Sequence, residues 1–259
     1  MNICFIGDIV AAPGRSAIRN ALPGFLRSND IDLCIANGEN AAHGLGCSLK
    51  IVNEITDCGV DIVTLGNHSF SNYEFLSQIG KLNNVVKPSN VSSAWPGNDI
   101  AYFEKNGQRA AVINLMGQFQ MNPCCNDPFT RADQLIEEIR GEGVKTIIVD
   151  FHAEATGEKL AMGHYLDGRV SLVVGTHTHV QTADERILKG GTGYITDAGM
   201  TGCTDSVLGM DIETSLRRLR DKIPARYEPA IGDGSINGII VNVDNDGKCK
   251  GIRRFTEYE

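Results

Sequence analysis

Short apolar runs alternate with segments of helical spacing along most of the chain. In the first 80 residues, each apolar run leads through a loop into a segment whose apolar residues recur every three or four positions. We predict repeated units of strand, loop and helix, with a turn at Pro13-Gly14 before the first helix and an interruption of that helix at Pro23. The predicted strands cover residues 2–7, 31–36 and 61–65, and the predicted helices cover residues 18–26, 48–58 with Ser48 as the cap, and 71–79.

The pattern changes near residue 99 and then returns. Two strand patterns flank Asn106-Gly107, which is a hairpin signal, and a polar loop follows through Pro128. Beyond it we predict helices at residues 130–140, 154–162 and 211–222, and strands at residues 145–150, 171–175, 194–196, 238–243 and 249–255. The whole pattern predicts an α/β fold over a single domain, residues 1–259, in which a mixed central sheet is flanked by helices.

Composition adds limits on location and chemistry. No apolar run approaches the roughly 18 residues that a membrane span needs, and residues 1–7 lack a basic leader. We expect a soluble, cytoplasmic protein with no membrane partner. The eight cysteines contain no C-x-x-C pair, so we expect free thiols, with Cys4 and Cys34 packed in the core.

The net charge of −8 argues against a stable complex with nucleic acid, which depends on many Lys and Arg contacts to phosphate. A small anionic ligand stays compatible with this charge, because bound metal cations reverse the local field. The charge therefore directs attention to residues that can hold metal ions.

Polar side chains follow five of the predicted strands, at the point where each strand ends. In open α/β sheets the carboxyl edge is where ligands bind, so side chains far apart in sequence can meet there. Carboxylate, imidazole and amide groups suit Mn²⁺, Fe or Zn²⁺, and the absence of sulfur ligands argues against a structural zinc cage. These residues are Asp8, Glu39, Asn40, Asn67, His68, His152, His177 and His179.

Each of these residues also has an ordinary structural explanation. His177 and His179 are two positions apart, so in an extended segment both imidazoles would point to one face, but a pair of polar loop histidines is the alternative. Asp8 and Glu39 precede predicted helices and would serve as helix caps. Capping explains either carboxylate alone, but not the full set of strand-end residues.

Gly66-Asn67-His68 is the most specific fragment, and it resembles the Gly-Asn-His motif of calcineurin-like metallophosphoesterases. In that motif a metal ligand precedes a catalytic imidazole, so the resemblance implies a calcineurin-like fold and a catalytic role for His68. Longer stretches resemble the YmdB-like bacterial branch over essentially the full chain. They are Gly7-Asp8, Asn37 to Gly44, Asp150-Phe151-His152, Gly175 to Thr182 and Asp197 to Gly202.

Three departures from the wider superfamily agree with the YmdB-like pattern. The usual Asp-x-His is Asp8-Ile9-Val10 here, and Glu39 stands where a second Asp normally bridges the metals. Asn40 can supply the coordination that the missing histidine leaves open. Ser69 replaces the acidic residue that often follows the catalytic histidine.

The resemblance implies a 2′,3′-cyclic-nucleotide 2′-phosphodiesterase that yields nucleoside 3′-phosphates. Two metal ions, Fe or Mn with Zn as an alternative, would bind a shared water, and the resulting hydroxide would attack phosphorus while His68 protonates the leaving oxygen. The resemblance also implies a ligand set. Glu39 would bridge the ions, Asp8, Asn40 and His179 would complete one, and Asn67, His152 and His177 the other.

Other assignments stay open. His43 either contacts the substrate, a small nucleotide phosphodiester, or is an exposed loop residue, and we expect His164 to be structural. A phosphomonoesterase would need the same metals and usually a cationic pocket, and a regulatory protein that senses a metal and nucleotide with little turnover would not need a leaving-group acid. Edge strands near Ala101 and Ile113 would allow a homo-oligomer.

Overall fold

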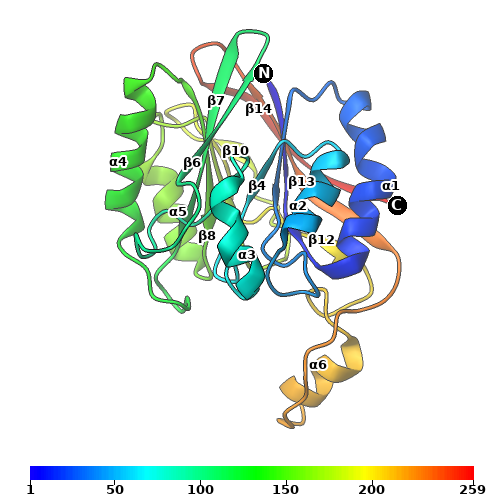
Figure 1. Ribbon diagram of the computed structural model, residues 1–259. Helices are drawn as coiled ribbons and strands as arrows, with labels where there is room; N and C mark the ends of the chain where they lie inside the picture. Colours follow the sequence, from blue (N-terminus) through cyan, green and yellow to red (C-terminus); the bar gives the residue numbers. More distant parts are fainter.

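Two β-sheets pack face to face in this computed structural model, which describes all residues from 1 to 259 (Figure 1). The first sheet has the order β2-β12-β13-β1-β3-β4-β5, and β14 pairs with β13 at its side. Its strands are β1 (Asn2–Ile6), β2 (Asp8–Ile9), β3 (Leu33–Asn37), β4 (Ile62–Thr64), β5 (Val85–Val86), β12 (Met200–Cys203), β13 (Gly234–Val243) and β14 (Cys249–Tyr258).

The second sheet has the order β10-β11-β9-β8-β7-β6. Strands β7, β8, β9 and β11 are parallel, and the edge strands β6 and β10 are antiparallel to their neighbours. Its strands are β6 (Ile100–Lys105), β7 (Gln108–Met116), β8 (Thr146–His152), β9 (Leu172–Thr176), β10 (Arg186–Ile187) and β11 (Gly193–Ile195).

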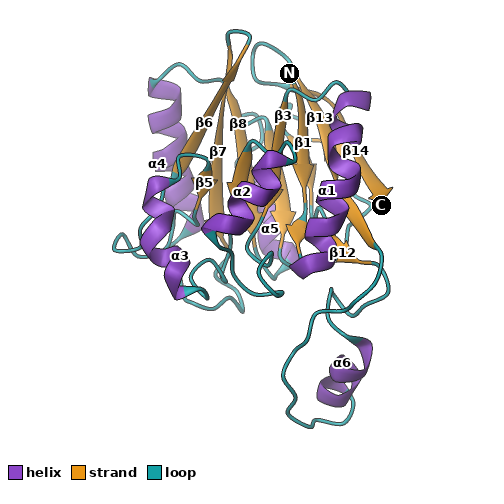
Figure 2. Cartoon of the chain, turned by 45° about the vertical axis from the view of Figure 1, so that its right-hand side comes forward, coloured by secondary structure: helices purple, strands orange, loops and turns teal.

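Helices cover the outer face of each sheet (Figure 2). The outer face of the first sheet carries α1 (Ala11–Ser28), α2 (Leu49–Asp57) and α3 (Tyr73–Gln78), followed by a short 3₁₀ turn at Ile79–Lys81. The second sheet carries α4 (Pro128–Gly141) and α5 (Thr156–Tyr165). The predicted α/β architecture, with mixed sheets flanked by helices, is confirmed.

The core between the sheets explains the continuous apolar runs of the sequence. Phe5 and Ile35 of the first sheet pack in one buried cluster with Val112, Ile148 and Leu172 of the second. A strand buried on both faces has no polar alternation, because neither face meets water. The cysteines are all free thiols, and the predicted burial of Cys4 and Cys34 is confirmed.

Helix α1 differs from the prediction. It begins at Ala11 and runs unbroken to Ser28, so the predicted turn at Pro13-Gly14 and the interruption at Pro23 are both wrong. Pro13 lies in the first helical turn, where its missing N–H is not needed. Ala17, Ile18 and Leu22 are buried against the sheet, and this packing holds the helix together past Pro23.

An arm leaves the body of the protein after β12 and returns at β13 (Figures 1 and 2). It carries α6 (Ile212–Leu219), which extends away from both sheets. The arm closes at its base, where Met210 pairs with Pro229 and the Asp211 N–H donates to the Glu228 carbonyl at 2.9 Å. None of the helices has the length and apolar character that crossing a membrane requires.

Candidate metal centre

The predicted ligands lie at the carboxyl ends of strands from both sheets. Asp8 begins β2, which only Gly7 separates from β1, Glu39 and Asn40 follow β3, and Asn67 follows β4. His152 is the last residue of β8. Because the parallel strands of each sheet end at one edge, these side chains reach a common region between the sheets.

Neither carboxylate serves as a helix cap. The N-cap of α1 is Val10, and the N-cap of α2 is Ser48, whose side chain accepts a hydrogen bond from Ile51 N. Asp8 and Glu39 are both fully buried instead. The capping explanation of Asp8 and Glu39 is therefore wrong. Because burying a carboxylate is costly unless it is paired, the partners of these two carboxylates identify the site.

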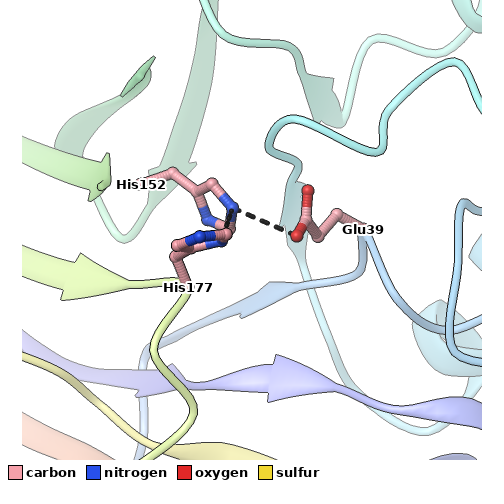
Figure 3. A group of neighbouring side chains, drawn as sticks. All are labelled: Glu39, His152 and His177. Atoms are coloured by element: carbon pink, nitrogen blue, oxygen red, sulfur yellow. Dashed lines mark hydrogen bonds and ion pairs between the residues drawn. The ribbon is translucent and has the colours of Figure 1, made fainter. Parts of the chain in front are cut away.

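The first group of side chains surrounds the Nε2 atom of His152. Asn67 Oδ1 lies 2.9 Å away, Glu39 Oε1 lies 3.1 Å away, and His177 Nδ1 lies 3.1 Å away. The ligand atoms of Glu39, His152 and His177 all lie within 4.8 Å of one another, and the three side chains converge in Figure 3. This arrangement has the donor set and size of a metal site.

The tautomers of this group favour a cation. The hydroxyl of Thr176 donates to Asp150 and therefore accepts from Nδ1 of His152, which leaves the Nε2 lone pair of neutral His152 facing Glu39 and Asn67. Nε2 of His177 lies 3.1 Å from Glu154, so its Nδ1 lone pair also faces inward. Acceptor atoms that face one another at about 3 Å repel unless a proton or a metal ion lies between them.

The second group consists of Asp8, Asn40 and His179. His179 Nε2 lies 3.7 Å from Asp8 Oδ1 and 3.3 Å from Asn40 Nδ2. Nδ1 of His179 faces the carbonyl of Leu208, in the arm, at 3.2 Å. Asp8 Oδ1 is buried without a hydrogen-bond partner, and an orphaned carboxylate oxygen of this kind fits a metal ligand.

Glu39 touches both groups. Its Oε1 accepts from Asn40 Nδ2 at 3.1 Å and contacts His152, and its Oε2 accepts from the backbone N–H of His68 at 2.9 Å. Gly66 leaves the room for this carboxylate, because a Cβ there would lie 2.3 Å from Glu39 Oε2 and 2.5 Å from His152 Nε2. A side chain at position 66 would fill the site.

The pKa values of these side chains reflect their contacts. Burial raises the pKa of Glu39, but neighbouring His152 outweighs it and lowers the value to about 2. Burial likewise lowers the pKa of His152, but Glu39 outweighs it and raises the value to about 9. For His177, burial and then His152 lower the pKa to about 3, and for Asp8 burial raises the pKa against the opposing His179. A proton on Nε2 of His152 would therefore occupy the position between His152 and Glu39 in which a metal cation fits.

His68 lies beside this centre. Its ring Nε2 lies 3.3 Å from Asn67 Nδ2, and the residue is partly buried. Burial lowers the pKa of His68, with Glu39 acting against it. The protonated ring is therefore a stronger acid than an ordinary imidazolium.

His177 and His179 do not share a face as predicted. Both residues have positive φ angles, 94° and 65°, so the segment is not extended. The turn sends His177 to Glu39 and His152 and sends His179 to Asp8 and Asn40. The prediction of an extended pair is wrong because the segment leaves β9 at Thr176, before the first histidine.

The other two histidines lie outside both groups. His43 is exposed in the loop after Asn40, and a Cβ on the next residue, Gly44, would lie 2.5 Å from the Met210 Cε of the arm. His164 is exposed on α5. The groups that hold the histidines have no predicted role, and they are Asp150, Glu154, Thr176 and the Leu208 carbonyl. Of these, Asp150 and Thr176 lie within the motifs at residues 150–152 and 175–182, which signalled them only as neighbours of the histidines.

Comparison with known proteins gives the family. The family described as YmdB-like protein matches residues 4–255. A 2′,3′-cyclic-nucleotide 2′-phosphodiesterase of Bacillus subtilis (strain 168) is 46% identical over 248 residues, which are 96% of this chain and 93% of that protein.

Solved structures agree with this family. A crystal structure described as a hypothetical protein of Thermus thermophilus aligns with a TM-score of 0.93 at 39% identity and covers 100% of both chains. A Mycoplasma pneumoniae phosphatase aligns with a TM-score of 0.93 at 32% identity, over 100% of this chain and 93% of that one. An NAD nucleotidase of Haemophilus influenzae shares the fold alone, with a TM-score of 0.61 at 15% identity over 100% of this chain and 56% of that one. The fold is thus that of nucleotidase-type metallophosphoesterases, and the chain belongs to the YmdB-like protein family.

Proposed function

We propose that this chain is a dinuclear-metal phosphodiesterase that hydrolyses 2′,3′-cyclic nucleotides to nucleoside 3′-phosphates. Its family and its relatives make it a phosphoric ester hydrolase. The observation that carries the two-ion proposal is the position of Glu39, whose carboxylate contacts Asn40 of one ligand group and His152 of the other. A bridging carboxylate needs this kind of placement.

The two ligand groups divide as follows. Asp8, Asn40 and His179 would hold one ion, and Glu39 would be shared. Asn67, His152 and His177 would hold the other. Bound metal ions, Fe or Mn by resemblance, would supply positive charge against the phosphate and lower the pKa of a water molecule.

The residues around the ligands keep their geometry fixed. Thr176 holds His152 by Nδ1, Glu154 holds His177 by Nε2, and the Leu208 carbonyl holds His179 by Nδ1. Each contact fixes the tautomer of one ring and directs its other nitrogen inward. Substrate phosphate oxygens would therefore meet a rigid set of ligands.

His68 would donate the proton that the leaving group needs. Cleavage of the bond between phosphorus and the 2′-oxygen releases an alkoxide unless that oxygen is protonated. The lowered pKa of His68 makes its protonated form a good donor, and its contact with Asn67 places it at the edge of one ligand group. The product of this step is the nucleoside 3′-phosphate.

The experiment is hydrolysis of 2′,3′-cyclic AMP by Mn²⁺-reconstituted protein, with products separated by chromatography and EDTA as the control. We expect 3′-AMP and no 2′-AMP, and we expect EDTA to abolish the reaction. Protein with two bound ions per chain that releases 2′-AMP would overturn the assigned bond. The same protein without turnover would overturn the cyclic-nucleotide substrate.

A further inference from the structure

A buried ion pair lies directly behind the segment that carries His177 and His179. Lys159, on α5, is 1% exposed, and Asp197 is 0% exposed. Lys159 Nζ lies 2.8 Å from Asp197 Oδ2. Burying two charges is costly unless additional hydrogen bonds satisfy them, so the partners of this pair show what it holds in place.

The pair holds Thr178, which stands between the two histidines. Asp197 Oδ2 accepts from the Thr178 N–H at 3.1 Å and from its hydroxyl at 2.6 Å, and Lys159 Nζ donates to that hydroxyl at 3.2 Å. The φ angles of His177 and His179 are positive, which is unfavourable for residues other than glycine. Such a backbone conformation persists only where neighbouring groups hold it in place. Thr178 provides that anchor.

The same carboxylate reaches the backbone of a third ligand. Asp197 Oδ1 accepts from Gly199 N at 2.8 Å, and the Gly199 carbonyl accepts from Asp8 N at 3.1 Å. His177 N in turn donates to Asp8 Oδ2 at 3.2 Å. One buried carboxylate thus connects the backbones of His177, His179 and Asp8, which belong to both ligand groups.

Lys159 reaches this carboxylate through a space that a glycine leaves. A Cβ on Gly175 would lie 3.0 Å from Lys159 Cδ and 1.8 Å from the Thr196 carbonyl. The ammonium group thus neutralises Asp197, which would otherwise add a further anion next to the ligands. The amine also donates to Thr178, so a purely apolar side chain could not replace it.

We propose that Lys159 and Asp197 are positioning residues that set the separation between the two ligand groups, by fixing the turn at Thr178. This proposal rests on the two-ion function proposed above. Without the pair, His177 and His179 both lose the fixed turn between them. The first group still keeps Asn67 and His152, which Thr176 holds, whereas the second keeps only Asp8 and Asn40 beside the shared Glu39. The ion of the Asp8 group should therefore be lost first.

The experiment compares Lys159→Met with Lys87→Met. Lys87 is a matched control, because it is also buried, at 4% exposure, and paired with a carboxylate, Asp99, at 2.5 Å. Manganese per chain after reconstitution and desalting is the first readout, and the melting temperature of the metal-stripped protein is the second. Wild type and Lys87→Met should hold two ions per chain, and Lys159→Met should hold close to one.

A milder pair of variants covers the case in which Lys159→Met fails to fold. Thr178→Val removes only the hydroxyl, and Thr178→Ser keeps it. We expect Thr178→Val to lower metal affinity and kcat by about 10- to 100-fold with KM nearly unchanged, and Thr178→Ser to restore both. The metal-stripped melting temperatures of the two variants should be similar.

The outcomes separate this proposal from the function on which it rests. A wild-type chain that takes up no manganese contradicts the proposed function and this proposal together. If the wild type holds two ions and Lys159→Met also holds two ions with an unchanged kcat, the positioning role alone is overturned. Equal metal binding by Thr178→Val and Thr178→Ser would overturn it as well.

Discussion

The hydroxyl of Thr176 lies 2.8 Å from Nδ1 of His152 and donates a hydrogen bond to Asp150 Oδ1 at 2.7 Å. This chain of hydrogen bonds fixes which nitrogen of His152 carries a proton in the neutral ring. The other nitrogen, Nε2, faces Glu39 Oε1 at 3.1 Å. Without a bound cation the carboxylate favours a proton on this nitrogen, and a metal ion would have to displace that proton.

This relationship predicts that metal binding releases a proton and strengthens as the pH rises. The pKa of His152 is raised to about 9, so without a bound cation the ring is protonated at pH 7. Glu39, with a pKa of about 2, and His177, with a pKa of about 3, carry no proton to lose there. The apparent affinity should rise about tenfold per pH unit up to pH 9 and then level off.

Calorimetry in buffers of different ionisation enthalpy measures this proton directly. We expect at least one proton released per pair of ions bound at pH 7, the proton of His152, with any further release coming from Asp8 or from a metal-bound water. The Thr204→Val variant, altered at an exposed residue outside both ligand groups, should release the same number. Metal affinity that does not change between pH 6 and pH 9 would contradict the predicted displacement.

Gly66→Ala should abolish metal binding without unfolding the chain. A Cβ at this position would lie 2.3 Å from Glu39 Oε2 and 2.5 Å from His152 Nε2, so it would occupy the centre of the first ligand group. Metal content and hydrolysis should both fall to background while circular dichroism stays that of the wild type. Gly24→Ala is the control, because a Cβ there meets nothing within 4 Å and should stabilise α1 by about 1 kcal/mol.

His68→Ala should reduce turnover by about 10²- to 10⁴-fold, because the leaving oxygen loses its proton donor. Both ions should stay bound, since the contact from residue 68 to Glu39 is made by the backbone N–H and survives the substitution. Metal content and kcat are measured on the same preparation. The exposed His164 on α5 supplies the matched variant, His164→Ala, which should behave as wild type.

A His68→Ala protein that loses its metal would show that the side chain is a ligand instead of an acid. Retention of full activity would remove it from the mechanism altogether. A substrate with a better leaving group should recover part of the lost rate if His68 is the acid, because such a group needs less protonation.

His43→Ala should weaken substrate binding and leave kcat nearly unchanged. His43 is exposed in the loop that follows Glu39 and Asn40, and the arm packs against the neighbouring Gly44. One lost hydrogen bond, worth about 1 kcal/mol, corresponds to a rise in KM of roughly fivefold. Steady-state kinetics with 2′,3′-cyclic AMP tests this, and an unchanged KM would identify His43 as a bystander.

The sequence determined the longer strands of the sheets and most of the candidate ligand positions. Apolar runs such as residues 31–36 and 171–175 have one explanation, burial on both faces, and the polar residue that ends each run must lie at the carboxyl edge. The strand-end positions of Asp8, Glu39 and His152 follow from this local pattern. The Gly66-Asn67-His68 fragment, by its resemblance to a known motif, indicated a metal ligand followed by a catalytic imidazole.

Short elements escaped the sequence because contacts between distant residues define them. Strands β2 and β12 pair with each other over Met200 and Asp8, and β5 and β10 have two residues each, too few for an apolar period to be read. In helix α1 a local signal was present but misleading, because packing keeps the helix continuous through Pro23. In both cases tertiary contacts outweigh local preference.

Only the tertiary structure decided how the ligands divide. Spacing alone predicted one face for His177 and His179, and their turn toward different groups depends on Asp197, nearly 20 residues further along the chain. Glu154, Lys159 and the Leu208 carbonyl carry no recognisable motif. The sequence determines which residues stand at the strand ends because this follows from burial along each strand, whereas their partners follow from distances between segments that meet only in the folded chain.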